Sequence, residues 1–162
     1  MMTSRERILA DINHQSPDQV SVDLGATPGS GISAITYSNL VKHIAREDLP
    51  VRIYDVVQQL AQPDRSVLNH FGVDVLDIGH TFNNIPSNKS PVMNANGAAS
   101  FYPKWFQPAR MADCSYQTYD DDAKRINSCI PIGATFFDQT YFPYVDGYPD
   151  SYVNAVKEFN NR

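Results

Sequence analysis

Two titratable side chains, Asp77 and His80, follow the mostly apolar segment 73–76. Histidine titrates near neutral pH, so it can transfer protons or bind a metal ion. The two residues are three positions apart, and side chains at this spacing in a strand point to opposite faces. They would therefore act as a pair only if the strand ends at Gly79. We take both as candidate catalytic residues, with a structural role as the alternative.

Asp23 and Gly25 stand at the end of segment 20–24, in which apolar and polar side chains alternate. The loop from Gly25 to Gly31 holds three glycines, and a helix is expected to begin near Ser33. Backbone N–H groups of such a loop, aided by a helix N-terminus, can bind an anionic group. Glycine, proline and serine also form ordinary turns. Asp23 and Gly25 are thus candidate substrate-binding residues, and a simple strand-to-helix turn is the alternative.

A third candidate group lies in the aromatic-rich segment 136–152. Aromatic side chains with polar tips suit a flat or conjugated ligand, but they also pack in cores and interfaces. Asp138, Tyr141 and Tyr144 are the polar members that we take as candidate substrate-binding residues. No close Cys/His spacing of a zinc site accompanies them, because Cys114 and Cys129 stand alone. The sequence therefore predicts no metal ligand in this chain.

Capping signals and periodicity predict the elements that position these residues. Thr3 and Glu6 form a capping box, which predicts a first helix. Residues 20–24 alternate as a strand, and residues 33–46 carry apolar side chains at helical spacing. Segment 51–79 predicts helix, helix and strand. Within it, Asp64 suits a helix start and Gly72 a helix end.

The second half of the chain has a different composition. Residues 83–129 are rich in Asn, Pro, Ser and Gly, so we expect a loop-rich excursion there. Residues 126–130 predict a strand that Pro131 limits. Asp150 can cap a last helix. Three parts follow: residues 1–82 with the first βα units, 83–129, and 130–162 with the aromatic strand and helix.

Composition excludes several classes of function. Hydrophobic residues make up 42% and charged residues 19% of the 162 residues, which fits a protein with a packed core. The net charge of −5 argues against a nucleic-acid partner. No apolar run approaches the length of a membrane span, and the first residues lack an apolar signal region. We therefore expect a cytoplasmic protein with no nucleic-acid or membrane partner.

Four stretches resemble the uroporphyrinogen decarboxylase-like superfamily. They are TSRERILADINHQSPDQVSVDLG (3–25), GISAITYSNL (31–40), VRIYDVVQQLAQPDRSVLNHFGVDVLDIG (51–79) and GATFFDQTYFPYVDGYPD (133–150). The resemblance implies an α/β fold, a TIM (β/α)₈ barrel. Such a barrel needs roughly 250 residues, so we expect an incomplete barrel, the N-terminal part with an aromatic-rich insertion. The missing half would be supplied in cis or in trans, and this chain alone would be inactive.

The resemblance implies enzymes of two kinds. One branch transfers a methyl group between a corrinoid carrier and a thiol, and its full-length members use zinc and a corrinoid that no residue here matches. Its partners would be a small-molecule substrate or a corrinoid protein. The other branch is uroporphyrinogen decarboxylase of porphyrin and heme biosynthesis, which holds substrate carboxylates with arginine. No arginine occurs between Arg7 and Arg46, which favours the methyltransferase-like branch. A non-catalytic interaction module or a degraded gene product is the remaining alternative.

Overall fold

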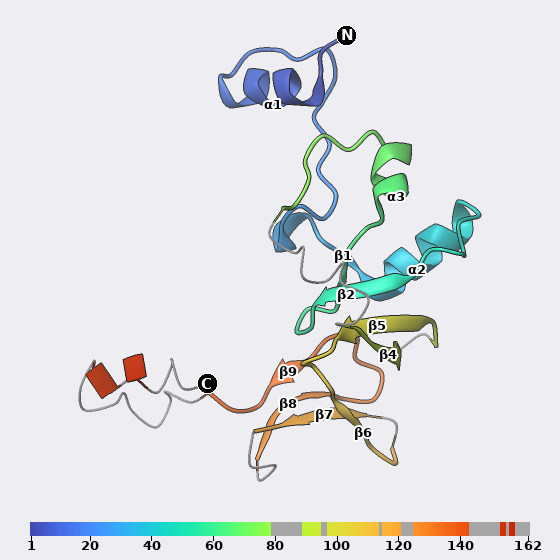
Figure 1. Ribbon diagram of the computed structural model, residues 1–162, viewed down its shortest axis with the longest axis vertical. Coiled ribbons are helices and arrows are strands. Elements are labelled where there is room, and N and C mark those ends of the chain that lie inside the picture. The colour runs from blue at the N-terminus through green and yellow to red at the C-terminus, as the bar shows by residue number, and fades with distance from the viewer. Residues whose placement is uncertain are drawn as a thin grey trace.

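The chain is described by a computed structural model over residues 1–78, 89–94, 97–113, 115–120, 125–142, 153–154 and 156–157. Figure 1 shows helix α1 at one end of the molecule and two sheets towards the other. The helices are α1 (Ser4–Ile12), α2 (Ala34–His43) and α3 (Arg65–His70), with a 3₁₀ turn at Pro28–Ser30. The strands are β1 (Ile32–Ser33), β2 (Val51–Asp55), β3 (Leu60–Ala61), β4 (Lys89–Met93), β5 (Ala99–Pro103), β6 (Ala109–Arg110), β7 (Tyr116–Tyr119), β8 (Ile126–Ile130) and β9 (Asp138–Gln139).

The strands form one five-stranded sheet in the order β1-β3-β2-β5-β4 and one four-stranded sheet in the order β6-β7-β8-β9. Only the β2–β5 pair is parallel among the described pairs. No barrel closes within the part of the chain that the structure describes. The incomplete TIM barrel stays a prediction.

Capping explains where the predicted helices begin and end. The capping box of Thr3 and Glu6 is formed at the start of α1. Ser33 caps α2 by accepting a hydrogen bond from the Thr36 N–H at 3.2 Å. Asp64 caps α3, and Gly72 follows that helix with φ +61°, a conformation that favours glycine. These signals are local in the sequence, which is why they predict the structure well.

The prediction of a helix at the start of segment 51–79 is wrong. Residues Val51–Asp55 form strand β2, which a turn connects to β3. The Asp55 carboxylate accepts hydrogen bonds from the N–H groups of Val57 and Gln58, at 3.0 and 2.8 Å, and so closes that turn. β-Branched and aromatic residues favour a pleated strand, and an aspartate that binds backbone N–H groups ends it.

The range 83–129, expected to be loop-rich, contains strands β4 to β7 and most of β8 among its described residues. Asn94 and Gly97 belong to the connection between β4 and β5. The Asn94 carboxamide oxygen accepts a hydrogen bond from Ala98 N–H at 3.0 Å, and Gly97 adopts φ +80°. Short strands separated by turn residues have the same composition as a loop, so composition alone misled the prediction. Strand β8 agrees with the prediction for 126–130 and ends before Pro131.

Segments 20–24 and 73–78 are extended and lie side by side, although neither forms a regular strand. The Asp74 N–H donates to the Val22 carbonyl oxygen at 2.8 Å. The Val22 N–H donates to the Asp74 carboxylate at 3.0 Å. Both segments run away from α1 in the same direction (Figure 1). The two segments predicted to be the first strands of the fold are therefore neighbours, but neither is a strand in the structure.

Arg7 joins these two segments to α1. Its guanidinium is buried and contacts the carboxylates of Asp18, at 3.0 Å, and of Asp74. Arginine suits this position because its planar fork can engage two carboxylates at once. The pKa values of Asp18 and Asp74 lie below the ordinary value. The largest cause is a backbone hydrogen bond that each carboxylate accepts, and contact with the Arg7 guanidinium lowers both pKa values further. The ion pairs therefore fix the start of the chain against segment 73–78.

The core lies between α2 and the five-stranded sheet. Its buried members are Ala34, Tyr37, Val41, Val51, Ile53, Val56, Ala61, Val67 and Tyr102. The buried hydroxyl oxygen of Tyr37 accepts a hydrogen bond from the Asp64 N–H at 2.9 Å, which ties α2 to the start of α3. None of the described helices is long and apolar enough to cross a membrane.

Tyr37→Phe is expected to lower the free energy of unfolding by about 1–2 kcal/mol, because the Asp64 N–H loses its acceptor. Urea unfolding followed by circular dichroism measures this change. Tyr119→Phe removes the same atom from an exposed side chain and serves as the control. Equal stability of wild type and Tyr37→Phe would contradict the prediction.

Asp74→Asn is expected to reduce the loss of stability in acid. A lowered pKa means that the folded state favours the ionised carboxylate. The ionised Asp74 carboxylate contributes fully to the free energy of unfolding above the ordinary aspartate pKa of about 3.9. This contribution is lost as the pH falls through the lowered pKa of the folded state. The urea midpoint, measured from about pH 6 to about pH 2, should fall less steeply in Asp74→Asn than in the wild type. Asp11→Asn, on the exposed surface of α1, should keep the wild-type pH dependence.

Candidate functional site

The Gly25–Gly31 loop is closed by its own hydrogen bonds. Gly25 N–H donates to the Ser30 carbonyl at 2.9 Å, and Ser30 N–H donates to the Thr27 carbonyl at 3.1 Å. Asp23 is exposed, and its carboxylate accepts from the Ala26 N–H at 3.1 Å. These N–H groups are engaged within the loop and do not converge on a ligand position. The geometry therefore favours the turn interpretation of this loop over an anion cradle.

Gly25 is required at its position for a steric reason. It has φ +83°, and a Cβ atom there would lie 3.0 Å from the Cδ atom of Pro63. The loop thus packs against the residue that precedes the start of α3. Gly25 acts here through packing and backbone conformation, and its role in substrate binding stays a prediction.

The contact between Val22 and Asp74 brings the segments of Asp23 and Asp77 side by side. Asp77 is half-buried and lies three residues after Asp74, whereas Asp23 directly follows Val22. The two carboxylates thus follow the same contact between two neighbouring segments of the chain. The partner residue His80 lies outside the described residues, as does Tyr144. The catalytic roles of Asp77 and His80 stay predictions.

The remaining candidates lie in the four-stranded sheet. Asp138 is exposed on β9, where it pairs with Cys129 of β8. Tyr141 is half-buried, and the Arg125 guanidinium carbon lies 4.0 Å from the centre of its ring. This cation–π contact gives Tyr141 a structural partner. Asp138 thus lies on β9 and Tyr141 just after it, whereas the segments of Asp23 and Asp77 belong to neither sheet.

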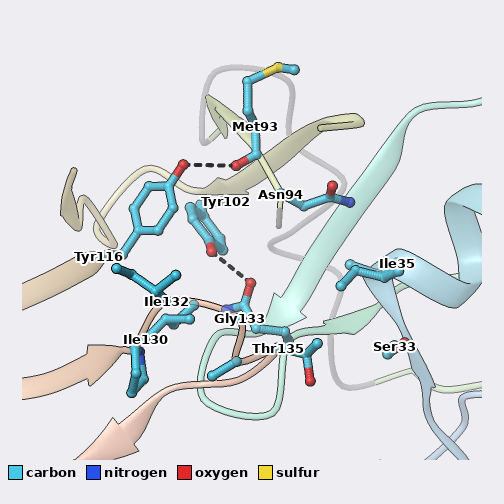
Figure 2. Close-up of a pocket in the computed structure, with 14 residues that line it drawn as sticks. Ser33, Ile35, Met93, Asn94, Tyr102, Tyr116, Ile130, Ile132, Gly133 and Thr135 are labelled. Carbon is cyan, nitrogen blue, oxygen red and sulfur yellow. Dashed lines mark hydrogen bonds between the residues drawn. The ribbon is translucent and has the colours of Figure 1, made fainter. Parts of the chain in front are cut away.

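A cavity of about 360 Å³ lies where α2, the five-stranded sheet and the four-stranded sheet meet. This volume is at the lower end of the range of about 300–1,000 Å³ that is usual for small-molecule sites. Figure 2 shows side chains from all three parts directed toward the same space. The lining residues are Ser33, Ala34, Ile35, Gln59, Met93, Asn94, Tyr102, Tyr116, Ile130, Pro131, Ile132, Gly133, Ala134 and Thr135. None of the predicted site residues that the structure describes lines it.

A buried hydrogen bond forms one wall of this cavity. The Tyr102 hydroxyl donates to the Gln59 carboxamide oxygen at 2.6 Å, and both side chains are buried. Burial raises the pKa of Tyr102 to about 12, and the hydrogen bond to Gln59 opposes this shift in part. Tyr102 is therefore a neutral donor at physiological pH and is not suited to act as a base there.

The cavity walls are held together by a second tyrosine. The Tyr116 hydroxyl of β7 donates to the Met93 carbonyl oxygen of β4 at 3.1 Å, as Figure 2 shows. This bond crosses from one sheet to the other. Among the described residues, the lining carries no Lys, Arg, Asp, Glu or His. It can bind and orient a ligand through hydrogen bonds and apolar contact.

Four polar residues of the cavity, Gln59, Asn94, Tyr102 and Tyr116, were not among the predicted site residues. Asn94 carried only a turn signal in the sequence, and Gln59 lay in a segment predicted to be helical. The one usable signal was the segment 130–150, since Gly133, Ala134 and Thr135 line the cavity. Sites formed by residues distant in the sequence leave no local pattern.

The described residues do not fit a zinc site. No group of three or more His, Cys, Asp or Glu side chains comes together within the described ranges. Cys129 is a free, half-buried thiol on β8, and Cys114 lies outside those ranges. No reaction step through zinc or a corrinoid is therefore derived from these residues.

Tyr102→Phe is expected to lower the free energy of unfolding at neutral pH by about 1–3 kcal/mol, because the buried Gln59 oxygen loses its donor. The variant should also lose less stability in base. A raised pKa means that the unfolded state ionises first, so stability falls as the pH rises from about 10 towards about 12. Urea midpoints across this range test both effects, with the exposed Tyr119→Phe as control. A variant with wild-type stability at neutral pH would contradict the assignment of this bond.

Comparison with known proteins gives no further identification. No family model matches the chain, and no curated protein or solved structure matches it.

Proposed function

We propose that this chain is the N-terminal portion of a uroporphyrinogen decarboxylase-like enzyme of the methyltransferase-like branch. Such an enzyme transfers a methyl group between a corrinoid carrier and a thiol. The observation that carries the proposal is the contact between Val22 and Asp74. In a (β/α)₈ barrel, consecutive parallel strands are neighbours and the reacting groups follow their C-terminal ends. Segments 20–24 and 73–78 are arranged as such a pair would be, with Asp23 and Asp77 after the contact.

The methyltransferase-like branch is preferred to the decarboxylase for an electrostatic reason. A substrate with many carboxylates needs cationic side chains, and arginine is the best suited of them. Arg7 is occupied by Asp18 and Asp74, and no arginine occurs between Arg7 and Arg46. The loop after segment 20–24 thus offers no cationic side chain to such a substrate. Uroporphyrinogen decarboxylation is the second candidate.

Strands β4 to β9, within residues 89–139, fit an excursion between barrel segments. Apart from the parallel pairing of β5 with β2, they pair antiparallel, whereas a barrel is built from parallel strands that alternate with helices. On this proposal they would cover the end of the barrel where the substrate binds. The barrel strands beyond this chain would come from the same polypeptide or from a partner.

The proposal is tested by methyl transfer from methylcobalamin to 2-mercaptoethanesulfonate. The chain is assayed alone and together with the polypeptide encoded directly downstream of its reading frame. We expect no transfer by the chain alone and transfer by the pair, seen as formation of the methyl thioether by mass spectrometry. Asp77→Asn in the active pair should lower the rate by roughly a hundredfold if Asp77 takes part in proton transfer.

Asp11→Asn, on the exposed surface of α1, is the matched control and should leave the rate unchanged. Decarboxylation of uroporphyrinogen by the pair, measured by chromatography of the oxidised porphyrins, would favour the second candidate. A pair that catalyses neither reaction would overturn the enzyme proposal and leave the interaction module.

A further inference from the structure

The strand register fixes which way the backbone groups of β4 point. Among the described strands, β4 is the last of the five-stranded sheet and pairs with β5 alone. In an antiparallel pair, residue pairs that exchange two backbone hydrogen bonds alternate with pairs that exchange none. The Asn94 N–H donates to the Ala98 carbonyl at 3.0 Å, one step beyond the end of the β4–β5 register, so this is a bonded pair. Two residues back, Val92 and Ser100 are bonded in the same way.

Pro91 therefore belongs to the other kind of pair, with Phe101 as the opposite residue. Its backbone nitrogen and carbonyl point away from β5, toward the outer edge of the sheet, and the same holds for Lys89 and Met93. Proline has no N–H group, so it cannot donate a hydrogen bond to an added strand. The outer edge of β4 thus lacks a donor at the middle one of its three outward residues.

The next outward residue, Met93, has an occupied acceptor. Its carbonyl oxygen accepts a hydrogen bond from the Tyr116 hydroxyl of β7 at 3.1 Å, as Figure 2 shows. This bond agrees with the outward direction given by the register, because β7 belongs to the four-stranded sheet. A strand laid along this edge would need the backbone groups of Lys89, Pro91 and Met93. It would find no donor at Pro91 and an occupied acceptor at Met93.

The side chains of this edge are apolar and accessible. Pro91 is exposed and Met93 is 49% exposed, so apolar surface lies beside the outward backbone groups. A strand at the edge of a sheet is a template for pairing with another chain, and exposed apolar side chains favour such pairing. Proline on an edge strand is one of the means by which proteins prevent it. The position of Pro91 in the register fits this role.

We propose that Pro91 and Tyr116 close the outer edge of β4 and keep the five-stranded sheet from pairing with a second copy of this chain. Pro91 withholds the N–H group that an added strand would use, and Tyr116 occupies the neighbouring carbonyl. The inference rests on the β4–β5 register and the bond from Tyr116, and it does not depend on the proposed enzyme function. A strand supplied by another polypeptide would have to join the molecule elsewhere.

The test variant is Pro91→Thr, which restores the N–H group. Its side chain is polar, so any association it causes cannot be due to a more apolar surface. We expect Pro91→Thr to associate more tightly than the wild type in sedimentation velocity over a series of protein concentrations. Each restored hydrogen bond should strengthen association about fivefold, so a symmetric dimer that gains two should form about 25-fold more tightly. The backbone amide at position 91 should exchange with solvent more slowly as the dimer forms.

Tyr116→Phe tests the second block without changing β4. It frees the Met93 carbonyl and should also strengthen association, and the two substitutions together should have a larger effect than either alone. Pro28→Thr is the matched control. It makes the same change at an exposed proline outside both sheets, and it should leave association unchanged.

Urea unfolding at low protein concentration shows whether the variants keep the fold. Pro91→Thr should have the wild-type midpoint, because the changed backbone atom faces away from β5 and the side chain is exposed. Three results would overturn the proposal: no gain in association in Pro91→Thr or Tyr116→Phe, association of Pro91→Thr without slower exchange at position 91, or an equal gain in Pro28→Thr.

Discussion

The structure depends most on the hydrogen bonds of Gln59. This buried residue adopts φ +57° in the turn between β2 and β3, a conformation that costs a non-glycine residue about 1–2 kcal/mol. Its backbone carbonyl accepts from the Ala34 N–H at 2.8 Å, at the start of α2. Its side chain accepts from Tyr102 on β5 and donates to the Val56 carbonyl. One residue therefore joins a helix, a turn and the other side of the sheet, and these bonds offset the backbone strain.

The cavity is a consequence of this arrangement. The turn that contains Gln59 also contacts the segment that leads into β9 of the four-stranded sheet. The Phe137 N–H donates to the Val57 carbonyl at 2.9 Å. Phe137 is buried against Phe106, with ring centres 5.2 Å apart. The second sheet thus approaches the first at the turn and leaves the lined space between them. Several polar groups of the wall are satisfied by this packing, among them the hydroxyls of Tyr102 and Tyr116.

The two ends of the described chain are organised by different forces. At the N-terminal side, Arg7 and the backbone of Val22 hold Asp74, and charge fixes the position of extended segments. In the second half, antiparallel strand pairing and aromatic contacts fix the positions of the segments. Trp105 contacts Phe106 but remains 67% exposed. The first arrangement holds the two segments on which the proposed function rests. The second provides the cavity, which does not require a barrel.

The sequence by itself determined the features that depend on neighbouring residues. The capping box of Thr3 and Glu6, the start of α2 after Ser33 and the end of α3 before Gly72 are contacts within one turn of chain. The limit that Pro131 sets to β8 is equally local. Only the tertiary structure decided that segment 51–61 pairs as strands and that residues 89–119 form sheets, because strand pairing depends on partners far along the chain. The cavity belongs to the same class, since Gln59, Asn94 and Tyr116 meet only after both sheets have formed.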